Sequence, residues 1–249
     1  MTTTMGLIVG SGFEMLGLEV VARSPTKTPY GEPSSPVLTA RIGERLVACI
    51  ARHGERHALA PHEINYRANL WALHERGVRT CLGVNTVGAI APGFAPGDLA
   101  VPDQLIDYTY GRPATFGGEG AVVHVDFTEP FDALLRGRLA AAVAECGYGV
   151  RRGTYGVTQG PRLETAAEVD RLARDGCAMV GMTAMPEAVL ARELGWAYAI
   201  CAVAVNFAAG RSAEGTPIAA EMAASLGLGL QRVAEVVRRI IPSLIGDAV

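Results

Sequence analysis

Short apolar runs recur along the chain, and turn-forming residues separate them. Runs of this length are typical of buried strands, and they occur at residues 6–9, 46–51, 81–84, 99–106, 153–157, 177–181 and 197–205. Between several of them the apolar positions have helical spacing, at residues 65–75, 131–146, 165–175, 186–194 and 217–241, the last ending near Pro242. Strands that alternate with helices predict an α/β fold with a central, parallel or mixed sheet flanked by helices.

The pattern shows no linker between separate units. Pro29, Pro33 and Pro36, and the glycine-rich residues 111–120, mark irregular loops, and no internal repeat or low-complexity segment interrupts the sequence. A chain of 249 residues with 49% hydrophobic and 19% charged residues is long and apolar enough for one deep core. We therefore expect a single domain over residues 1–249.

Charge and cysteine content narrow the class of protein. A net charge of −3 provides no basic surface for nucleic acid, and no apolar stretch reaches the roughly 18 residues of a membrane-spanning helix. Residues 1–4 are neutral and lead into a short apolar run, unlike a signal peptide. The five cysteines are widely spaced without a CxxC pair, which favours reduced core thiols. The expectation is a cytoplasmic protein that binds neither membranes nor nucleic acid.

Polar side chains follow several of the predicted strands. Because strand ends of an open α/β sheet face one crevice, these groups are candidates for a shared oxyanion site: Ser11, Arg52, His53, Thr86 and Thr183, with Asn85 beside Thr86. Residues 10–12 are also compatible with a simple tight turn. The two histidines within residues 51–57 allow a metal site, although no acidic or thiol partner stands at ligand spacing.

A second group of polar residues suggests a ligand that carries N–H groups. Glu164 follows Gly160-Pro161 where a predicted strand gives way to a helix, and an ionised carboxylate only accepts hydrogen bonds. The alternative is a first-turn glutamate favoured by the helix dipole. Asn206 ends the run at 197–205, where an amide is a turn former or a donor and acceptor for a heterocycle. Glu187, after Pro186, fits an ordinary first helical turn.

Six segments together resemble the trimeric purine nucleoside phosphorylase and methylthioadenosine phosphorylase family. They are GLIVGSG at 6–12, ARHG at 51–54, INYRANLWAL at 64–73, NTVGAI at 85–90 with PGDL at 96–99, GPRLET at 160–165 and GMTAMPEAVLARELG at 181–195. They span the chain nearly end to end in the order of the family, so their joint occurrence is specific where any one would not be. The Walker, GxSxG and HExxH patterns of other enzyme classes do not occur.

The resemblance implies phosphorolysis, in which inorganic phosphate attacks C1′ of a purine nucleoside and releases the base. It implies phosphate contacts at Ser11, Arg52, His53 and Thr183, with Asn85 and Thr86 beside them, and a ribose contact at Met182. The methylthioadenosine branch has threonine where Asn85 stands. His124 resembles a histidine that reaches the active site of the neighbouring subunit, which implies a homotrimer. Phosphate is a co-substrate, and no metal or organic cofactor is implied.

The same resemblance gives Glu164 and Asn206 the catalytic and base-binding roles. A 6-oxopurine presents N1–H, which Glu164 can accept, and N7 and O6, to which Asn206 can donate. The adenosine-type branch has aspartate where Asn206 stands, a second carboxylate where this chain has Ala208, and no glutamate at 164. Ala208 is accordingly expected to be a substrate contact that does not select adenine.

The 5′ side of the substrate follows from a missing histidine. The inosine/guanosine branch uses a histidine of the C-terminal helix near the 5′-hydroxyl, whereas His124 is the last histidine here. The region instead offers the small or apolar residues Thr216, Pro217, Ile218, Ala219 and Met222, which suit a methylthio group. The expected substrate is S-methyl-5′-thioinosine. Inosine/guanosine phosphorylase, methylthioadenosine phosphorylase and a non-catalytic nucleoside-binding protein remain alternatives.

Overall fold

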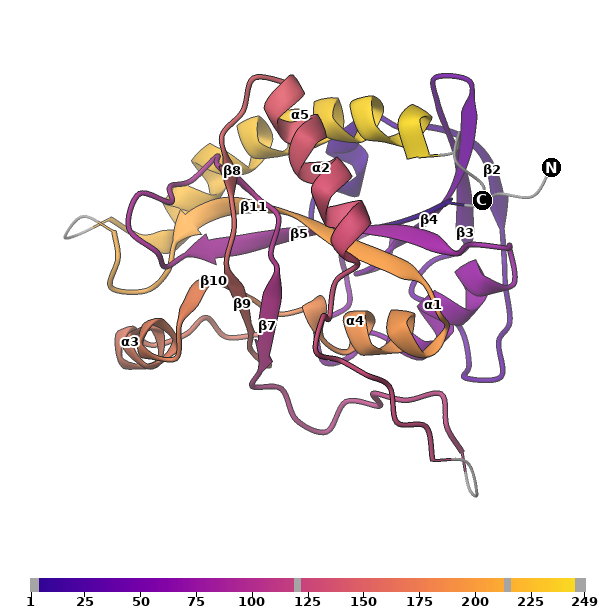
Figure 1. Cartoon of the computed structure of the whole chain (residues 1–249), viewed down its shortest axis with the longest axis horizontal. Helices are drawn as coiled ribbons and strands as arrows, with labels where there is room; N and C mark the ends of the chain where they lie inside the picture. The colour runs from indigo at the N-terminus through magenta and orange to yellow at the C-terminus, as the bar shows by residue number, and fades with distance from the viewer. Residues whose placement is uncertain (1–4, 119–121, 213–215, 245–249) are drawn as a thin grey trace.

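One mixed sheet organises the computed structural model, which describes residues 5–118, 122–212 and 216–244 (Figure 1). Its strands are β1 (Met5–Val9), β2 (Glu19–Ser24), β3 (Val37–Ile42), β4 (Arg45–Ala51), β5 (Thr80–Ala89), β6 (Leu99–Ala100), β7 (Gln104–Asp107), β8 (Val150–Arg151), β9 (Thr154–Val157), β10 (Cys177–Gly181) and β11 (Ala197–Phe207). The helices are α1 (Tyr66–His74), α2 (Ala133–Glu145), α3 (Ala166–Arg174), α4 (Ala184–Glu193) and α5 (Ile218–Leu244), with a short 3₁₀ turn at Phe13–Leu16.

The long strand β5 is the axis of this sheet. The strand order is β2-β3-β4-β1-β5-β10-β9-β7, while β11 pairs along the whole of β5 and also contacts β6, which continues to β8. β5 runs parallel to β1 and β11 but antiparallel to β10. The predicted α/β architecture with a mixed, helix-flanked sheet is therefore confirmed.

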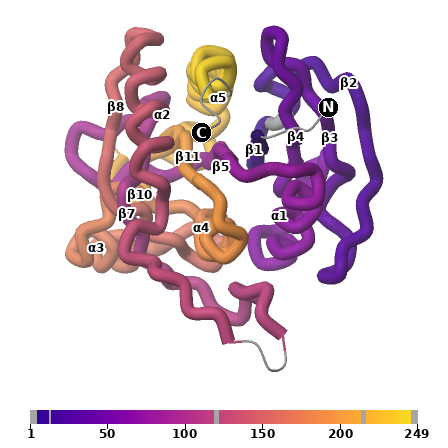
Figure 2. Tube along the Cα trace, turned by 45° about the vertical axis from the view of Figure 1, so that its right-hand side comes forward, coloured from indigo at the N-terminus to yellow at the C-terminus, as the bar shows by residue number. Residues whose placement is uncertain are grey.

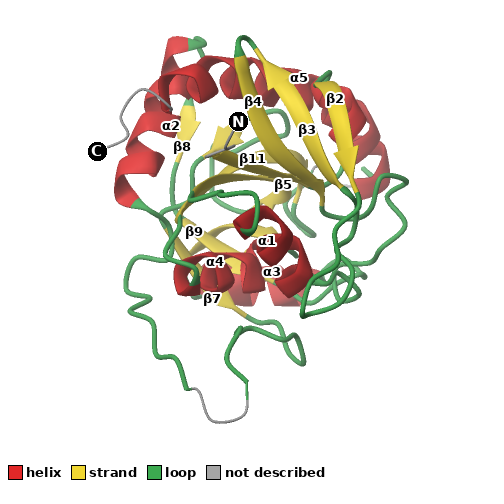
Figure 3. Cartoon of the chain, turned by 90° about the vertical axis from the view of Figure 1, so that its right-hand side faces the viewer, coloured by secondary structure: helices red, strands yellow, loops and turns green. Residues whose placement is uncertain are grey.

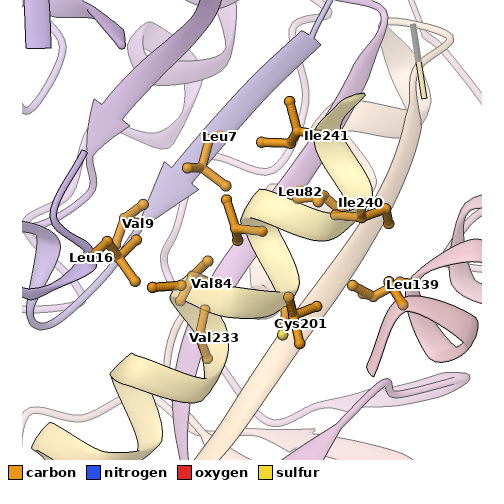
Figure 4. Close-up of a cluster of buried hydrophobic side chains, with 14 of the residues drawn as sticks. Leu7, Val9, Leu16, Leu82, Val84, Leu139, Cys201, Val233, Ile240 and Ile241 are labelled. Atoms are coloured by element: carbon orange, nitrogen blue, oxygen red, sulfur yellow. The ribbon is translucent and has the colours of Figure 1, made fainter. Parts of the chain in front are cut away.

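Helices cover both faces of the sheet and bury one apolar cluster on each (Figure 3). On β1, Leu7 and Val9 point into the cluster under α2 and α5, whereas Ile8 points into the cluster under α1 and α4. Figure 4 shows the first cluster, in which Leu139 of α2 and Val233 of α5 meet the sheet. The period-two alternation of the strands places successive side chains in opposite layers, as strand geometry requires.

Several predicted boundaries need correction. The run at 99–106 is two strands, because Pro102 has no N–H for a ladder. The run at 81–84 does not turn at Asn85 but continues as β5 to Ala89. α5 passes Pro242, which lies in its last turn and removes only one helical hydrogen bond. The strands β2, β3 and β8 have no counterpart in the prediction. β2 is a mostly exposed strand at the end of the sheet path and β8 has only two residues, whereas in β3 the polar Thr39 and Arg41 interrupt the apolar positions.

A segment between β7 and α2 extends away from the body of the molecule (Figure 2). We call its described residues, 108–118 and 122–131, the projecting segment. Its first part packs against the body through Arg112, and it carries the exposed His124 further along.

The cysteine side chains lie mostly in the core, as their position in apolar runs predicts. All five thiols are free, and Cys49, Cys81, Cys177 and Cys201 are buried. No helix in the described residues is long and apolar enough to cross a membrane.

Candidate active site

A cavity of about 410 Å³ lies where β5, β10 and β11 end, a volume typical of small-ligand sites. Its lining comes from loops, strand ends and the start of α5: Ser11, His53, His57, Ala58, Leu59, Ala60, Pro61, Thr86, Val87, Gly88, Pro161, Leu163, Glu164, Val180, Gly181, Met182, Thr183, Val205, Asn206 and Met222. The site thus forms at the place where parallel and antiparallel pairing meet on β5.

Hydroxyl and imidazole groups gather in one part of this lining. Ser11 Oγ lies 3.0 Å from His57 Nε2, and Thr86 adds a second hydroxyl. Thr183 is the N-cap residue of α4, yet its side chain caps no backbone N–H of that helix. Instead its hydroxyl accepts a hydrogen bond from Asn85 Nδ2 at 2.9 Å, which leaves its own proton to donate. Because Met185 has a non-helical backbone, the regular part of α4 begins only after it, so the hydroxyl rather than the helix end is the donor that Thr183 offers to an anion.

His53 is held in its neutral form. Its Nδ1 lies 2.8 Å from the Leu59 carbonyl oxygen and must donate the hydrogen bond, because a carbonyl only accepts. Burial, followed by the charges of Arg52 and His57, lowers the pKa of His53 to about 4. In this tautomer Nε2 is an acceptor, so a phosphate oxygen that carries a proton is the partner it fits.

Arg52 lies behind the cavity wall rather than in it. Its guanidinium has no exposed surface, and its Nε and Nη2 donate to Glu187 Oε1 and Oε2 at 2.5 and 2.9 Å. Nη1 donates to the Val84 carbonyl at 2.9 Å. The expected direct phosphate contact is therefore replaced, in this structure, by a buried ion pair that joins β4 to α4. Glu187, correctly interpreted as structural, accepts a further hydrogen bond from Tyr198.

Asn85 also supports the site from behind. Its side chain is buried outside the cavity lining, where Oδ1 accepts from Arg52 Nη2 at 3.1 Å and Nδ2 donates to Thr183. Both ends of the amide are satisfied inside the protein. The structure thus places Asn85 as the group that orients the Thr183 hydroxyl, not as a group facing the ligand.

Glu164 faces the cavity from the loop before α3. Its Oε1 accepts from Thr158 Oγ1 at 2.6 Å, and a carboxylate has capacity for further donors from a ligand. The alternative of a first-turn glutamate is wrong, because Thr165 is the N-cap and Glu168 completes the capping box. The helix therefore has its own cap, and Glu164 stands outside it.

Asn206 faces the same cavity because β11 is irregular at that point. The pairing register with β5 shifts between Ala204 and Asn206, and both Val205 and Asn206 line the cavity although neighbours in a regular strand point to opposite faces. Asn206 Nδ2 donates one N–H to the Phe207 carbonyl at 2.7 Å. Its second N–H and its Oδ1 can serve a ligand.

The structure brings together Ser11, His53, Thr86, Glu164, Met182, Thr183, Asn206 and Met222 from separate elements. Ala208 does not join them: it is 2% exposed and belongs to the buried cluster that contains Val169 and Val180. Of the residues proposed for the 5′ side, Thr216, Pro217, Ile218 and Ala219 are absent from the lining. His124 lies on the projecting segment, outside the lining.

Sequence reasoning missed the wall formed by residues 57–61 and the apolar contacts of Pro161, Leu163 and Val180. The two histidines within residues 51–57 could have indicated this wall, but only His53 was assigned to the site. His57 adopts a left-handed conformation, with φ 52°, that no apolar pattern reveals. Among the described residues no group of three or more His, Cys, Asp or Glu side chains is arranged to hold a metal.

Comparison with known proteins shows the family to which this chain belongs. Residues 4–242 match the family described as the phosphorylase superfamily, and the chain belongs to it. It is 51% identical over 213 residues to a probable S-methyl-5′-thioinosine phosphorylase of Xylella fastidiosa, covering 84% of this chain and 86% of that protein. A protein of the same name from Pseudomonas syringae pv. tomato is 46% identical over 243 residues, covering 96% and 98%. A methylthioadenosine phosphorylase crystal structure from an antarctic soil metagenomic library superposes with a TM-score of 0.91 at 32% identity, covering 99% and 88%.

Proposed function

We propose that this protein catalyses the phosphorolysis of S-methyl-5′-thioinosine to hypoxanthine and 5-methylthioribose 1-phosphate. The observation that carries the proposal is a single cavity that combines hydroxyl and imidazole groups with Glu164, Asn206 and an apolar side chain at Met222. The two relatives named as methylthioinosine phosphorylases support the same substrate, since they match this chain over most of its length.

The phosphate would bind at Ser11, Thr86, Thr183 and His53, close to the N-terminus of α4. The hydroxyls supply donors to an anion, and His53 Nε2 accepts the remaining phosphate proton. Asn85 and Arg52 act behind this layer by fixing the hydroxyl of Thr183. This division of roles keeps the guanidinium paired with Glu187 while the anion meets neutral donors.

The base would be read by Glu164 and Asn206. Glu164 accepts from N1–H of a 6-oxopurine, whereas adenine would bring an unprotonated N1 against the carboxylate. An unpaired buried polar group costs about 1–3 kcal/mol, so this contact selects hypoxanthine over adenine. The Asn206 amide, re-aimed by the bulge of β11, donates to N7 or O6.

The reaction follows from charge development. A phosphate oxygen forms a bond to C1′ while the bond from C1′ to N9 breaks, and its electron pair moves into the purine. The sugar becomes cationic in the transition state, so the bound phosphate anion stabilises it, and the donor at N7 stabilises the departing base. Holding both substrates in line supplies much of the rate. Met182 lines the cavity next to Thr183 and would pack on the ribose.

Met222 at the start of α5 supports the thioether specificity. It is the residue of the proposed 5′ lining that the cavity contains, and its polarizable side chain suits a methylthio group. Burial of such a group stabilises the complex by roughly 1–2 kcal/mol.

We further propose that residues 1–249 act as a single domain in a cytoplasmic homotrimer that needs no metal or organic cofactor. The exposed position of His124 on the projecting segment supports a role at a neighbouring subunit's site (Figure 2). The single mixed sheet that engages strands from residue 5 to residue 207 supports the single domain.

The deciding experiment measures base release from S-methyl-5′-thioinosine, inosine and S-methyl-5′-thioadenosine, with and without inorganic phosphate. We expect phosphate-dependent release that is fastest with methylthioinosine. Faster turnover of methylthioadenosine would refute the assignment of Glu164 and Asn206. Nucleoside binding without any phosphate-dependent turnover would instead identify a non-catalytic nucleoside-binding protein.

A further inference from the structure

Arg112, near the start of the projecting segment, makes an unusual set of contacts outside the cavity. Its guanidinium lies within hydrogen-bond distance of six neutral oxygens, three of which share the two N–H groups of Nη1. Four acceptors are backbone carbonyls, those of Thr158, Gln159, Met182 and Met185, and the others are Gln159 Oε1 and Tyr66 Oη. Three of the carbonyl contacts are 2.7 Å long.

The acceptor carbonyls come from two neighbouring chain segments that lead into the cavity walls. These segments continue from the paired strands β9 and β10, whose last contact is the bond from Thr158 N–H to the Gly181 carbonyl at 2.9 Å, so Arg112 joins them beyond the end of that pairing. The carbonyls of Thr158 and Gln159 open the loop that carries Glu164, whose carboxylate is itself bonded to the Thr158 hydroxyl. The carbonyls of Met182 and Met185 flank Thr183. One side chain therefore ties the segment that reads the base to the segment that holds the ribose and phosphate groups.

A third wall is reached through one intermediate. Tyr66 Oη accepts from Arg112 Nη1 at 3.3 Å and donates to the Pro61 carbonyl at 2.8 Å. Pro61 belongs to the wall at residues 57–61. The Arg112 guanidinium also lies 5.6 Å from the Tyr66 ring centre, a cation–π contact that helps to fix the tyrosine.

The chemistry of this cluster requires arginine. A guanidinium presents five N–H donors in a rigid planar fork, whereas lysine has three donors on a flexible stem. Carbonyl oxygens that converge from two chain segments repel one another, and a planar cation between them satisfies their lone pairs. Arg112 is not itself a lining residue of the cavity, so it can act on the ligand only through the walls it joins.

We propose that Arg112 is a positioning residue that sets the spacing between the base-reading loop at 158–164 and the ribose and phosphate segment at 182–185. The proposal rests on the proposed phosphorylase function, because it assigns both segments to substrates of one reaction. It also makes the projecting segment part of the active-site framework, since Arg112 belongs to that segment.

The test compares Arg112→Met, Arg112→Lys and a matched control, Arg79→Met. Arg79 Nη1 likewise donates to two backbone carbonyls, those of Val78 at 2.7 Å and His74 at 3.4 Å, but these contacts reach no residue of the cavity lining. We expect Arg112→Met to raise KM for nucleoside and for phosphate together, with kcat/KM lowered by about 10²-fold, the scale of a 1 Å misplacement. Arg112→Lys should fall between Arg112→Met and the wild type, and Arg79→Met should match the wild type.

Separate outcomes identify separate failures. A merely structural Arg112 would reduce the folded fraction and therefore kcat, with both KM values unchanged, and this result would overturn the proposal. Millimolar guanidinium should restore part of the KM loss in Arg112→Ala, a rescue that repair of stability alone would not give. Absence of phosphate-dependent turnover in the wild type would instead overturn the proposed function, before any Arg112 variant is compared.

Discussion

At the scale of residues, Glu164 and Asn206 approach one cavity from different elements, and neither depends on the other for its position. Thr158 holds Glu164, while the bulge of β11 and the Phe207 carbonyl hold Asn206. Their chemical complement is a heterocycle with one N–H and one acceptor on adjacent edges. Under the proposed function, the choice of base is therefore separable from the chemistry at the phosphate.

Glu164→Gln should weaken the preference of the enzyme for a 6-oxopurine over adenine. A glutamine can accept from N1–H or donate to an unprotonated N1, so the ratio of kcat/KM for methylthioinosine to that for methylthioadenosine should fall at least about tenfold, or about 1.4 kcal/mol. Glu168→Gln is the matched control, since Glu168 is an exposed capping residue four positions away. Equal ratios in the wild type and Glu164→Gln would contradict the base assignment.

His53 predicts a dependence of stability on pH. Its pKa is about 4 in the folded chain against 6.5 ordinarily, so between these values the unfolded chain binds more protons. The stabilisation is complete above pH 6.5 and is lost as pH falls toward 4, by about 3 kcal/mol at 1.36 kcal/mol per pKa unit. Denaturant unfolding of the phosphate-free protein and of His53→Gln across this range should show the steeper loss in the wild type. Parallel curves for the two proteins would argue against a neutral, buried His53.

At the scale of elements, β10 ends at a position that only glycine fits. A Cβ on Gly181 would overlap Tyr155 Oη and lie 2.7 Å from Tyr155 Cζ, because β9 and β10 pair closely there. Met182 and Thr183 follow directly and line the cavity, so the end of this strand places the residues proposed to contact ribose and phosphate. The packing of two neighbouring strands thus bears on the site.

Gly181→Ala should therefore destabilise the protein by about 1–3 kcal/mol, as overpacked substitutions do, and raise KM for phosphate. Gly137→Ala is a control for which we expect the opposite change in stability. Gly137 is exposed within α2 and nothing lies within 4 Å of an added Cβ, so loss of glycine flexibility should stabilise the protein by about 0.5–1 kcal/mol. Denaturant unfolding measures both changes. A neutral Gly181→Ala would mean that Tyr155 moves aside without cost.

The pattern of apolar runs predicted most of the buried elements, and it failed where polar residues interrupt a buried strand or where a strand is exposed. β10 was predicted with its observed bounds, and β11 within two residues. β5 was predicted to turn at Asn85 because a polar pair inside a buried strand resembles a turn, whereas Arg52 and Thr183 satisfy this amide within the sheet. The edge strand β2 is mostly exposed and so leaves no apolar run to detect.

The candidate site was predicted to the extent that its residues terminate strands. Ser11, His53, Thr183 and Asn206 were found in this way, and the structure brings them to one cavity. The sequence could not predict which of these residues face the cavity and which support it from behind. That depends on contacts such as the ion pair of Arg52 with the buried carboxylate of Glu187 on a distant helix. Sequence spacing carries no information about that pairing.

At the scale of the whole molecule, the sheet and its two helical layers leave the projecting segment as the part that extends furthest from the core (Figure 1). This segment has Arg112 at one end, anchored on the cavity walls, and the exposed His124 further along. If subunits associate through this segment, the same stretch of backbone forms the contact between chains and holds the cavity walls in place.

Mixed assemblies test the proposed sharing of sites. His124→Ala and Glu164→Ala should each lose activity alone, whereas co-assembled chains should recover it at about a quarter of the sites, where an intact Glu164 meets a partner's His124 in a cyclic trimer. Activity is measured on purified mixed trimers of known mass. If the mixture shows no more activity than the average of the separate variants, His124 does not act across the interface.

The reactivity of the buried thiols reports how often the core of the molecule opens. Cys49 and Cys201 lie on central strands, where burial raises the pKa of each thiol to about 12, whereas Cys146 after α2 is partly exposed. A thiol reagent can therefore reach Cys146 in the folded chain but the strand thiols only when the sheet separates. The rate at which the strand thiols react then reports how often the whole core opens, independently of any ligand or activity.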